Sequence, residues 1–232
     1  MTILKSKKIK SILTGVLAVF LTLSLSGPVF ASTNNKDAAT QKFSKDTIIT
    51  TDNAKSILKA YGIDPNTGVK SDKPIASVKT VADLEIALEE GKKLPSKIID
   101  NVTVSPLPLL PSSLAVINAI SYETRTTTTK YTSTLSVIYS ASGQHYTYGE
   151  EAWWTSAGSG SITPKATGIP GTFYQVTEQR RLSNQVYNAN TMSSYLQLSY
   201  DYDITHYVTV AGFTYPTSSS PIQGSVRFTG VF

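Results

Sequence analysis

The most distinctive run of side chains in this sequence is His145-Tyr146-Thr147-Tyr148-Gly149-Glu150-Glu151-Ala152-Trp153-Trp154. It places four aromatic rings and two carboxylates close together. Extracellular proteins use aromatic faces beside acids to stack on sugar rings and to hydrogen-bond them, and Trp and Tyr also gather at lipid interfaces. The run therefore supplies our candidate ligand-binding residues, which are Tyr146, Tyr148, Glu150, Glu151, Trp153 and Trp154.

The positions of the two adjacent tryptophans help to distinguish a ligand-binding role of this run from a role in core packing. Successive side chains of a regular strand point to opposite faces, so Trp153 and Trp154 cannot both enter one core. We expect one of them to be buried and the other to be exposed or at a strand end. The alternative is that alternate aromatic residues in this run only fill the core.

A second group of residues offers weak candidates for a metal site: Asp201, Asp203 and His145. The two aspartates lie at i and i+2 of an expected strand, so their carboxylates project from one face roughly 7 Å apart. Such a pair suits a hard cation or acid–base work on a glycosidic bond. No DxDxDG loop accompanies it, and the chain has two histidines in all. We therefore expect solvent-facing charges, with no metal and no cofactor.

Local signatures of catalysis are missing from the sequence. It contains no GxGxxG, GxxxxGK[ST] or GxSxG run, and no cysteine that could act as nucleophile or thiolate ligand. Ser56-x-x-Lys59 matches a fragment of a β-lactamase motif without its companion motifs. We expect a protein that is not an enzyme, and a secreted hydrolase using Asp or Glu with His is the least favoured alternative.

The N-terminus has the pattern of a secretory signal peptide over residues 1–31. Four lysines precede an apolar stretch from Ile12 to Leu25, and small residues then lead to expected cleavage after Ala31. Cleavage leaves 17 basic and 16 acidic residues of the original 21 and 16, a net charge of +1, so we expect no nucleic-acid partner. The absence of cysteine in an exported chain favours a bacterial protein, and the lysine-rich leader favours a Gram-positive host and an extracellular location.

Composition changes sharply near residue 120, since twelve of the 13 tyrosines follow it. We expect a flexible polar arm over 32–50, a small helical region over 51–104, a proline-rich linker over 105–120 and an antiparallel β domain over 121–232. Ala54, Ile57 and Leu58 share one face of a first helix, and Thr80 with Asp83 form a capping box for a second. Whether 32–120 is a docked domain or a removable propeptide stays open.

Residues 196–210 carry the clearest two-residue period. Apolar side chains and one histidine occupy the even positions from Leu196 to Val210, and polar side chains occupy most odd positions. Leu135, Val137 and Tyr139 repeat the pattern. The fold class expected is mainly β: an antiparallel β-sandwich, or a barrel-like sheet, preceded by a small α-helical N-terminal segment.

These observations predict a secreted, non-catalytic β-sandwich that binds an extracellular ligand, either cell-wall or environmental carbohydrate or a protein. The alternative is a secreted antibacterial or pore-forming protein of the bacteriocin or toxin kind, which long amphipathic strands also suit. Membrane contact is expected only under that alternative. The oligomeric state stays open.

Overall fold

The computed structural model describes residues 43–70, 76–105, 119–148 and 151–230. The predicted signal peptide, most of the predicted arm, most of the predicted linker and Glu150 lie outside these ranges. The chain is mainly β, with 61% strand and 11% helix, and its antiparallel sheets pack together. The expected fold class is confirmed.

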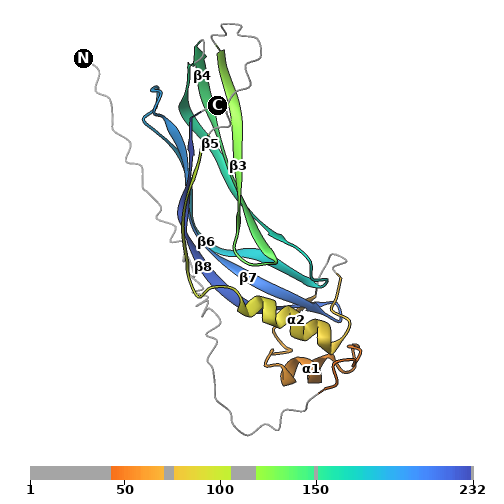
Figure 1. Cartoon of the computed structure of the whole chain (residues 1–232). Helices are drawn as coiled ribbons and strands as arrows, with labels where there is room; N and C mark the ends of the chain where they lie inside the picture. The colour runs from red at the N-terminus through yellow and green to blue at the C-terminus, as the bar shows by residue number, and fades with distance from the viewer. Residues whose placement is uncertain (1–42, 71–75, 106–118, 149–150, 231–232) are drawn as a thin grey trace, which may run out of the picture. The chain divides into compact units, whose positions relative to one another are not determined.

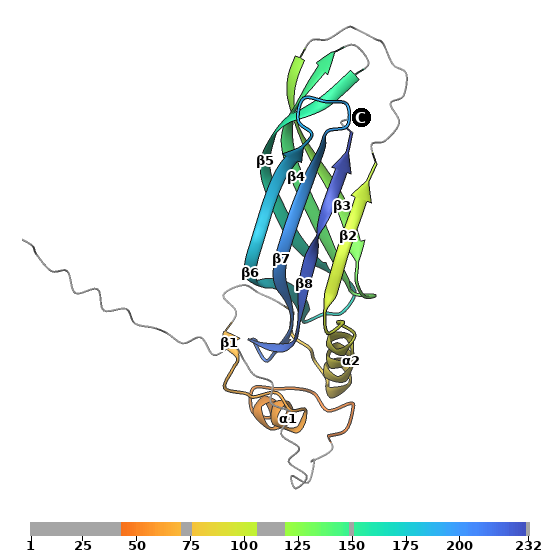
Figure 2. The ribbon, with the colours of Figure 1, turned by 90° about the vertical axis from the view of Figure 1, so that its left-hand side faces the viewer.

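Two sheets face each other (Figure 1). The first is a three-stranded antiparallel sheet in the order β3-β4-β5, formed by Ala119–Lys130, Leu135–Tyr148 and Glu151–Ala166. The second sheet has five strands: β1-β8-β7-β6 follow one another in this order, and β2 also pairs with β8. Their bounds are Val69–Lys70 (β1), Ile98–Val104 (β2), Thr172–Tyr187 (β6), Tyr195–Val210 (β7) and Phe213–Thr229 (β8). Figure 2 shows β6, β7, β8 and β2 side by side. β2 is parallel to β8, and the other pairings are antiparallel.

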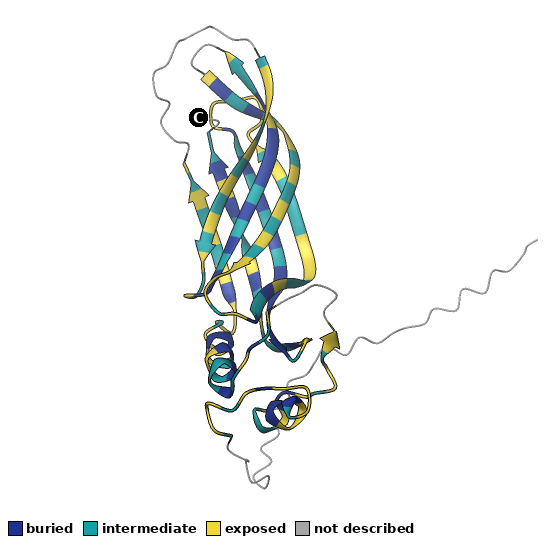
Figure 3. Ribbon diagram, turned by 90° about the vertical axis from the view of Figure 1, so that its right-hand side faces the viewer, coloured by how far each residue is buried: buried dark blue, intermediate teal, exposed yellow. Residues whose placement is uncertain are grey.

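The core lies between the two sheets and follows the predicted alternation. Every even-numbered residue of β7 from Leu196 to Val210 is buried. Leu135, Val137 and Tyr139 of β4 are also fully buried and pack in one cluster with the β7 residues from Leu196 to Ile204. Figure 3 shows the resulting bands of buried and exposed residues along the strands. Because no cysteine is present, burial and hydrogen bonds hold the sheets together.

Two helices, α1 (Ala54–Ala60) and α2 (Val81–Lys92), pack where β7 turns into β8. The capping box expected at the start of α2 is present, with the Asp83 amide donating to Thr80 Oγ1 at 3.2 Å. The helices bury Ile57, Leu58 and Leu84 in a second apolar cluster that includes residues from both strands. The helical part is thus attached to the sandwich by its own core.

Residues 43–50, which the sequence assigned to a flexible arm, pack against this second cluster. Ile49 is buried, and its amide donates to the Lys79 carbonyl at 2.8 Å. Phe43 also contacts the cluster. The segment is polar overall, so the sequence did not indicate that these two apolar residues would pack against the helices.

Strand β2 lies within the region for which the sequence indicated only helices. Its seven residues run parallel to β8, with Asp100 opposite Gly224. A Cβ atom built at Gly224 would lie 1.7 Å from the Asp100 carbonyl oxygen. Only glycine therefore allows β2 to approach β8 this closely.

A chain of hydroxyl groups joins β2 to β4 of the three-stranded sheet and from there to β7. The Tyr131 hydroxyl donates to Asp100 Oδ2 at 2.9 Å, and the same hydroxyl lies 2.5 Å from the Tyr139 hydroxyl. The Tyr139 hydroxyl in turn lies 2.9 Å from that of Tyr202 on the opposite sheet. Burial raises the pKa of the Tyr139 phenol, so it remains protonated and can donate.

A buried polar cluster joins α2 to the sandwich. Glu90 accepts hydrogen bonds from Ser133 at 3.0 Å and Thr134 at 3.2 Å, and it pairs with Lys93. His206 is fully buried beside it, with Nδ1 2.5 Å from Thr217 Oγ1 and no partner for Nε2 among the described residues. Burial lowers the pKa of His206 to about 4, although the Glu90 charge opposes that shift.

Replacing Gly224 with alanine tests the attachment of β2. We expect Gly224→Ala to lower the free energy of unfolding by about 1–3 kcal/mol, because the new methyl group collides with backbone. Amide hydrogens of Ile98–Val104 should also exchange faster. Gln223→Ala, at the exposed neighbouring position, should change stability by less than about 0.5 kcal/mol. Equal effects of the two substitutions would contradict the close approach.

The buried histidine predicts a loss of stability in acid. The pKa of His206 is lower in the folded chain than its ordinary value of 6.5. Its contribution is therefore complete above about pH 6.5 and is lost as the pH falls toward 4, by up to about 3 kcal/mol. The pKa of Glu90 is also lowered, chiefly by the hydrogen bond from Lys93, and its contribution is lost in the same direction. Urea unfolding from pH 7 to 4 should show a steeper fall for the natural chain than for His206→Asn, and parallel curves would refute the assignment.

Candidate functional site

The aromatic run identified in the sequence lies on the end of β4 and the start of β5, and its residues 149–150 lie outside the described ranges. Tyr146 on β4 is opposite Trp153 on β5 and Ile120 on β3, so the three side chains share one face of the sheet. That face is the outer one, since His145 and Trp154, the neighbours of Tyr146 and Trp153 in the chain, are buried between the sheets. The Tyr146 and Trp153 rings contact each other with centroids 5.2 Å apart and a tilt of 44°.

Tyr122 extends the same face by one row. It is opposite Gln144 on β4, yet its hydroxyl reaches the position where a Cβ of Gly158 on β5 would lie, 1.6 Å away. The ring must therefore lie across the sheet surface, and its hydroxyl is held 3.1 Å from Ser142 Oγ. Tyr122 remains 61% exposed, so one ring face is open to solvent.

We call these outward residues the aromatic face; they are Ile120, Tyr122, Tyr146, Tyr148 and Trp153. Ile120, Tyr122 and Tyr148 are each more than half exposed. Polar groups border the face, because Ser156 donates to Gln144 Oε1 at 3.1 Å and Glu151 is exposed opposite Tyr148. Flat rings beside hydrogen-bonding groups are suited to a ligand with both apolar and polar edges.

Trp154 is not part of this face. It is fully buried and makes three hydrogen bonds: its amide donates to Ser194 Oγ at 2.8 Å, its indole donates to the Gly230 carbonyl at 3.0 Å, and its carbonyl accepts from the Asn190 amide at 3.1 Å. The prediction that the two tryptophans lie on opposite faces is therefore correct: Trp154 is buried, and Trp153, near the start of β5, is partly exposed on the outer face. Listing Trp154 among the ligand-binding candidates is corrected, since a ligand on the outer face cannot touch it.

The other acidic and imidazole candidates of the run fall in different places. Glu151 borders the aromatic face, and Glu150 lies outside the described residues. His145 points inward, with its ring 5.7 Å from that of Trp154 and its Nε2 3.9 Å from a Glu123 carboxylate oxygen. Burial lowers the pKa of His145, which favours the neutral ring.

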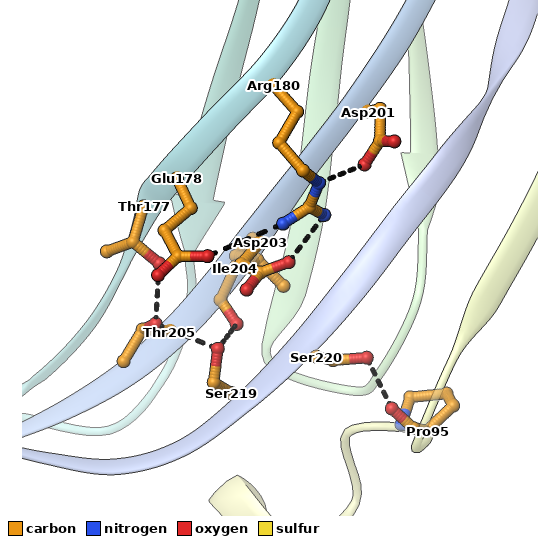
Figure 4. A network of polar contacts seen from close by, with 10 residues as sticks. All are labelled: Pro95, Thr177, Glu178, Arg180, Asp201, Asp203, Ile204, Thr205, Ser219 and Ser220. Atoms are coloured by element: carbon orange, nitrogen blue, oxygen red, sulfur yellow. Dashed lines mark hydrogen bonds and ion pairs between the residues drawn. The ribbon is translucent and has the colours of Figure 1, made fainter. Parts of the chain in front are cut away.

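The weak metal candidates are separated by the fold. Asp201 and Asp203 lie on the outer face of the five-stranded sheet, whereas His145 belongs to the other sheet. Figure 4 shows a single guanidinium between the two aspartates: Arg180 Nε lies 2.6 Å from Asp201 Oδ1, and its Nη2 lies 2.7 Å from Asp203 Oδ1. A bulge in β6 brings Arg180 there. A cation would have to displace it.

Two further findings concern the described residues only. No group of three or more His, Cys, Asp or Glu side chains there is arranged to hold a metal ion. No helix in the same ranges is long and apolar enough to span a membrane.

Sequence reasoning missed two members of the aromatic face, Ile120 and Tyr122. Their signal was present, because both lie at even positions of a strand that is otherwise rich in threonine. Only the register of β3 on β4 places them beside Tyr146. Comparison with family models, curated proteins and solved structures finds no match to this chain.

The two tryptophans should respond oppositely to substitution. Trp154→Ala removes a fully buried indole and should lower the free energy of unfolding by about 3–5 kcal/mol. Trp153→Ala leaves the core intact and should cost roughly 1 kcal/mol, the worth of the contact with Tyr146. Chemical denaturation of both variants checks this, and a severe loss of stability in Trp153→Ala would show that Trp153 is a packing residue.

Proposed function

We propose that this protein is a secreted, non-catalytic binding protein whose aromatic face binds extracellular carbohydrate. The observation that carries the proposal is the group of rings on the outer face of one sheet: Tyr122 and Tyr148 are more than half exposed, and Tyr146 and Trp153 are partly exposed. Single exposed apolar residues are ordinary on protein surfaces, but a contiguous group of them marks an interaction site. The core does not account for these rings, because they face away from it.

The rings are held in position before any ligand arrives. Tyr122 is pinned over Gly158 by the hydrogen bond to Ser142, and Tyr146 and Trp153 support each other. Rigid side chains lose little conformational entropy on binding, so more of the contact energy appears as affinity. A prearranged aromatic surface is what a binding role requires.

Carbohydrate suits this surface better than a protein ligand does. A sugar ring has an apolar C–H face that packs on an aromatic ring and a rim of hydroxyls that need partners. Gln144, Ser156 and Glu151 supply such partners beside the rings.

The extracellular setting of the proposal rests on the sequence. Residues 1–31 have the pattern of a signal peptide, and the chain that follows is cysteine-free and nearly neutral. A ligand outside the cell is the consistent choice. Cell-wall polymers and environmental polysaccharides are both within that class.

Sedimentation with insoluble polysaccharides tests the proposal. The secreted chain is incubated with peptidoglycan, chitin and cellulose, and the bound fraction is measured for the natural chain, Trp153→Ala and Tyr122→Ala. We expect each substitution to weaken binding to the preferred polymer about tenfold, since aromatic contacts are worth 0.5–1.5 kcal/mol beyond the buried area. Phe213→Ala is the control, because Phe213 is 40% exposed and begins β8, on the other sheet.

Several outcomes would count against the proposal. Unchanged binding by both aromatic-face variants would place the ligand elsewhere on the chain. Failure to bind any polysaccharide, together with dye release from liposomes, would favour the pore-forming alternative. Capture of one defined protein through the same residues would replace carbohydrate with a protein ligand.

A further inference from the structure

A second aromatic surface lies on the outer face of the five-stranded sheet. Tyr187 on β6 is opposite Tyr195 on β7, and their rings stack with centroids 5.1 Å apart and an angle of 8°. The Arg227 guanidinium on β8 lies 4.2 Å from the centroid of the Tyr195 ring. We call these three residues the Tyr187–Tyr195–Arg227 stack. It points away from the core, since Leu196 and Phe228 beside it are buried inward.

The charge of Arg227 is not neutralised within the described part of the chain. Arg180, lower on the same sheet, has three carboxylates within 4 Å, from Glu178, Asp201 and Asp203. Arg227 is exposed, and across the described ranges no carboxylate lies within ion-pair distance of it. Arg227 is therefore a positive charge without a nearby carboxylate on the outer face of the sheet, beside Tyr195.

The positions around Arg227 on the outer face carry no charge. Gln197 and Thr103 are opposite it on the neighbouring strands, and the next row holds Ser225, Ser199 and Asn101. Two amides are already oriented, since Gln185 Oε1 accepts from the Tyr187 hydroxyl at 3.1 Å and Gln197 Nε2 donates to Ser199 Oγ at 3.3 Å. These groups can form hydrogen bonds with the uncharged polar groups of a ligand whose anionic group binds Arg227.

The stack also fixes the orientation of the guanidinium. An arginine over an aromatic ring loses part of its freedom in the unbound protein, so less is lost when it binds an anion. Its planar fork matches a carboxylate with two parallel hydrogen bonds. The aromatic face on the other sheet is bordered instead by the carboxylate of Glu151, so the two surfaces suit ligands of different charge.

We propose that the Tyr187–Tyr195–Arg227 stack binds the carboxylate of an acidic glycan, with Arg227 as the anion-binding residue. The choice of a glycan rather than an acidic peptide rests on the function proposed above, whereas the anion preference rests on the stack itself. The chain then has two binding surfaces on opposite sheets, one for uncharged sugar and one for uronic acid units. One molecule can hold two polymer strands together.

Polygalacturonate and its methyl ester separate charge recognition from sugar recognition. We expect the secreted chain to bind polygalacturonate, and to bind the methyl ester at least roughly tenfold more weakly because the ester removes the charge-assisted hydrogen bonds. Arg227→Gln should reproduce that loss on polygalacturonate, and Arg227→Lys should give an intermediate affinity. Arg181→Gln is the matched control, since it removes one positive charge from an exposed position on the same sheet.

Any result that differs from these expectations contradicts a specific part of the proposal. No binding to polygalacturonate, equal binding of the ester, or equal losses for Arg227→Gln and Arg181→Gln would refute the site. Arg227-dependent binding of polyglutamate at the same affinity would replace the glycan with an acidic peptide. Trp153→Ala should leave polygalacturonate binding unchanged while reducing binding to neutral polysaccharide, so failure at one surface is distinguishable from failure at the other.

Discussion

The burial of Trp154 between the sheets is the constraint on which the aromatic face depends. Its indole fills the gap, and its hydrogen bonds join β5 to the loop before β7 and to the residue after β8. Because side chains alternate along a strand, Trp154 inside fixes Trp153 outside. The register of three strands then gathers the other exposed rings around Trp153. A packing requirement thus sets the geometry of a surface that the core itself does not use.

The helical part is held to the sandwich by polar contacts as well as by apolar packing. Glu90 and His206 lie in one interface, and the hydroxyl chain from Asp100 to Tyr202 crosses another. Buried polar groups are costly unless they are satisfied, so such contacts favour one docking arrangement over others. In a chain without disulfides, these networks supply the specificity of assembly, while burial of Leu and Ile side chains supplies most of the free energy.

The sequence predicted what depends on local period and local capping. The alternation from Leu196 to Val210, the Thr80–Asp83 capping box and the opposite placement of the two tryptophans are all present in the structure. Strand β2 was missed because seven residues flanked by helix and proline carry little periodic signal. Arg180 between two aspartates was missed for another reason: only a bulge and the pairing of β6 with β7 bring them together. The contacts of Arg180 depend on strand pairing between residues far apart in the chain, which residue type alone does not predict.

The position of β8 has a consequence for biogenesis. This last strand is bordered by β7 on one side and by β1 and β2 on the other, and the contact between Asn101 and Ser225 joins residues 124 positions apart. During synthesis from the N-terminus, β1 and β2 have no strand partner until β8 has emerged. High contact order of this kind slows folding and leaves edges open for longer. Pairing of β1 and β2 therefore waits for the synthesis of β8, and deletion of β8 would leave both strands without a partner.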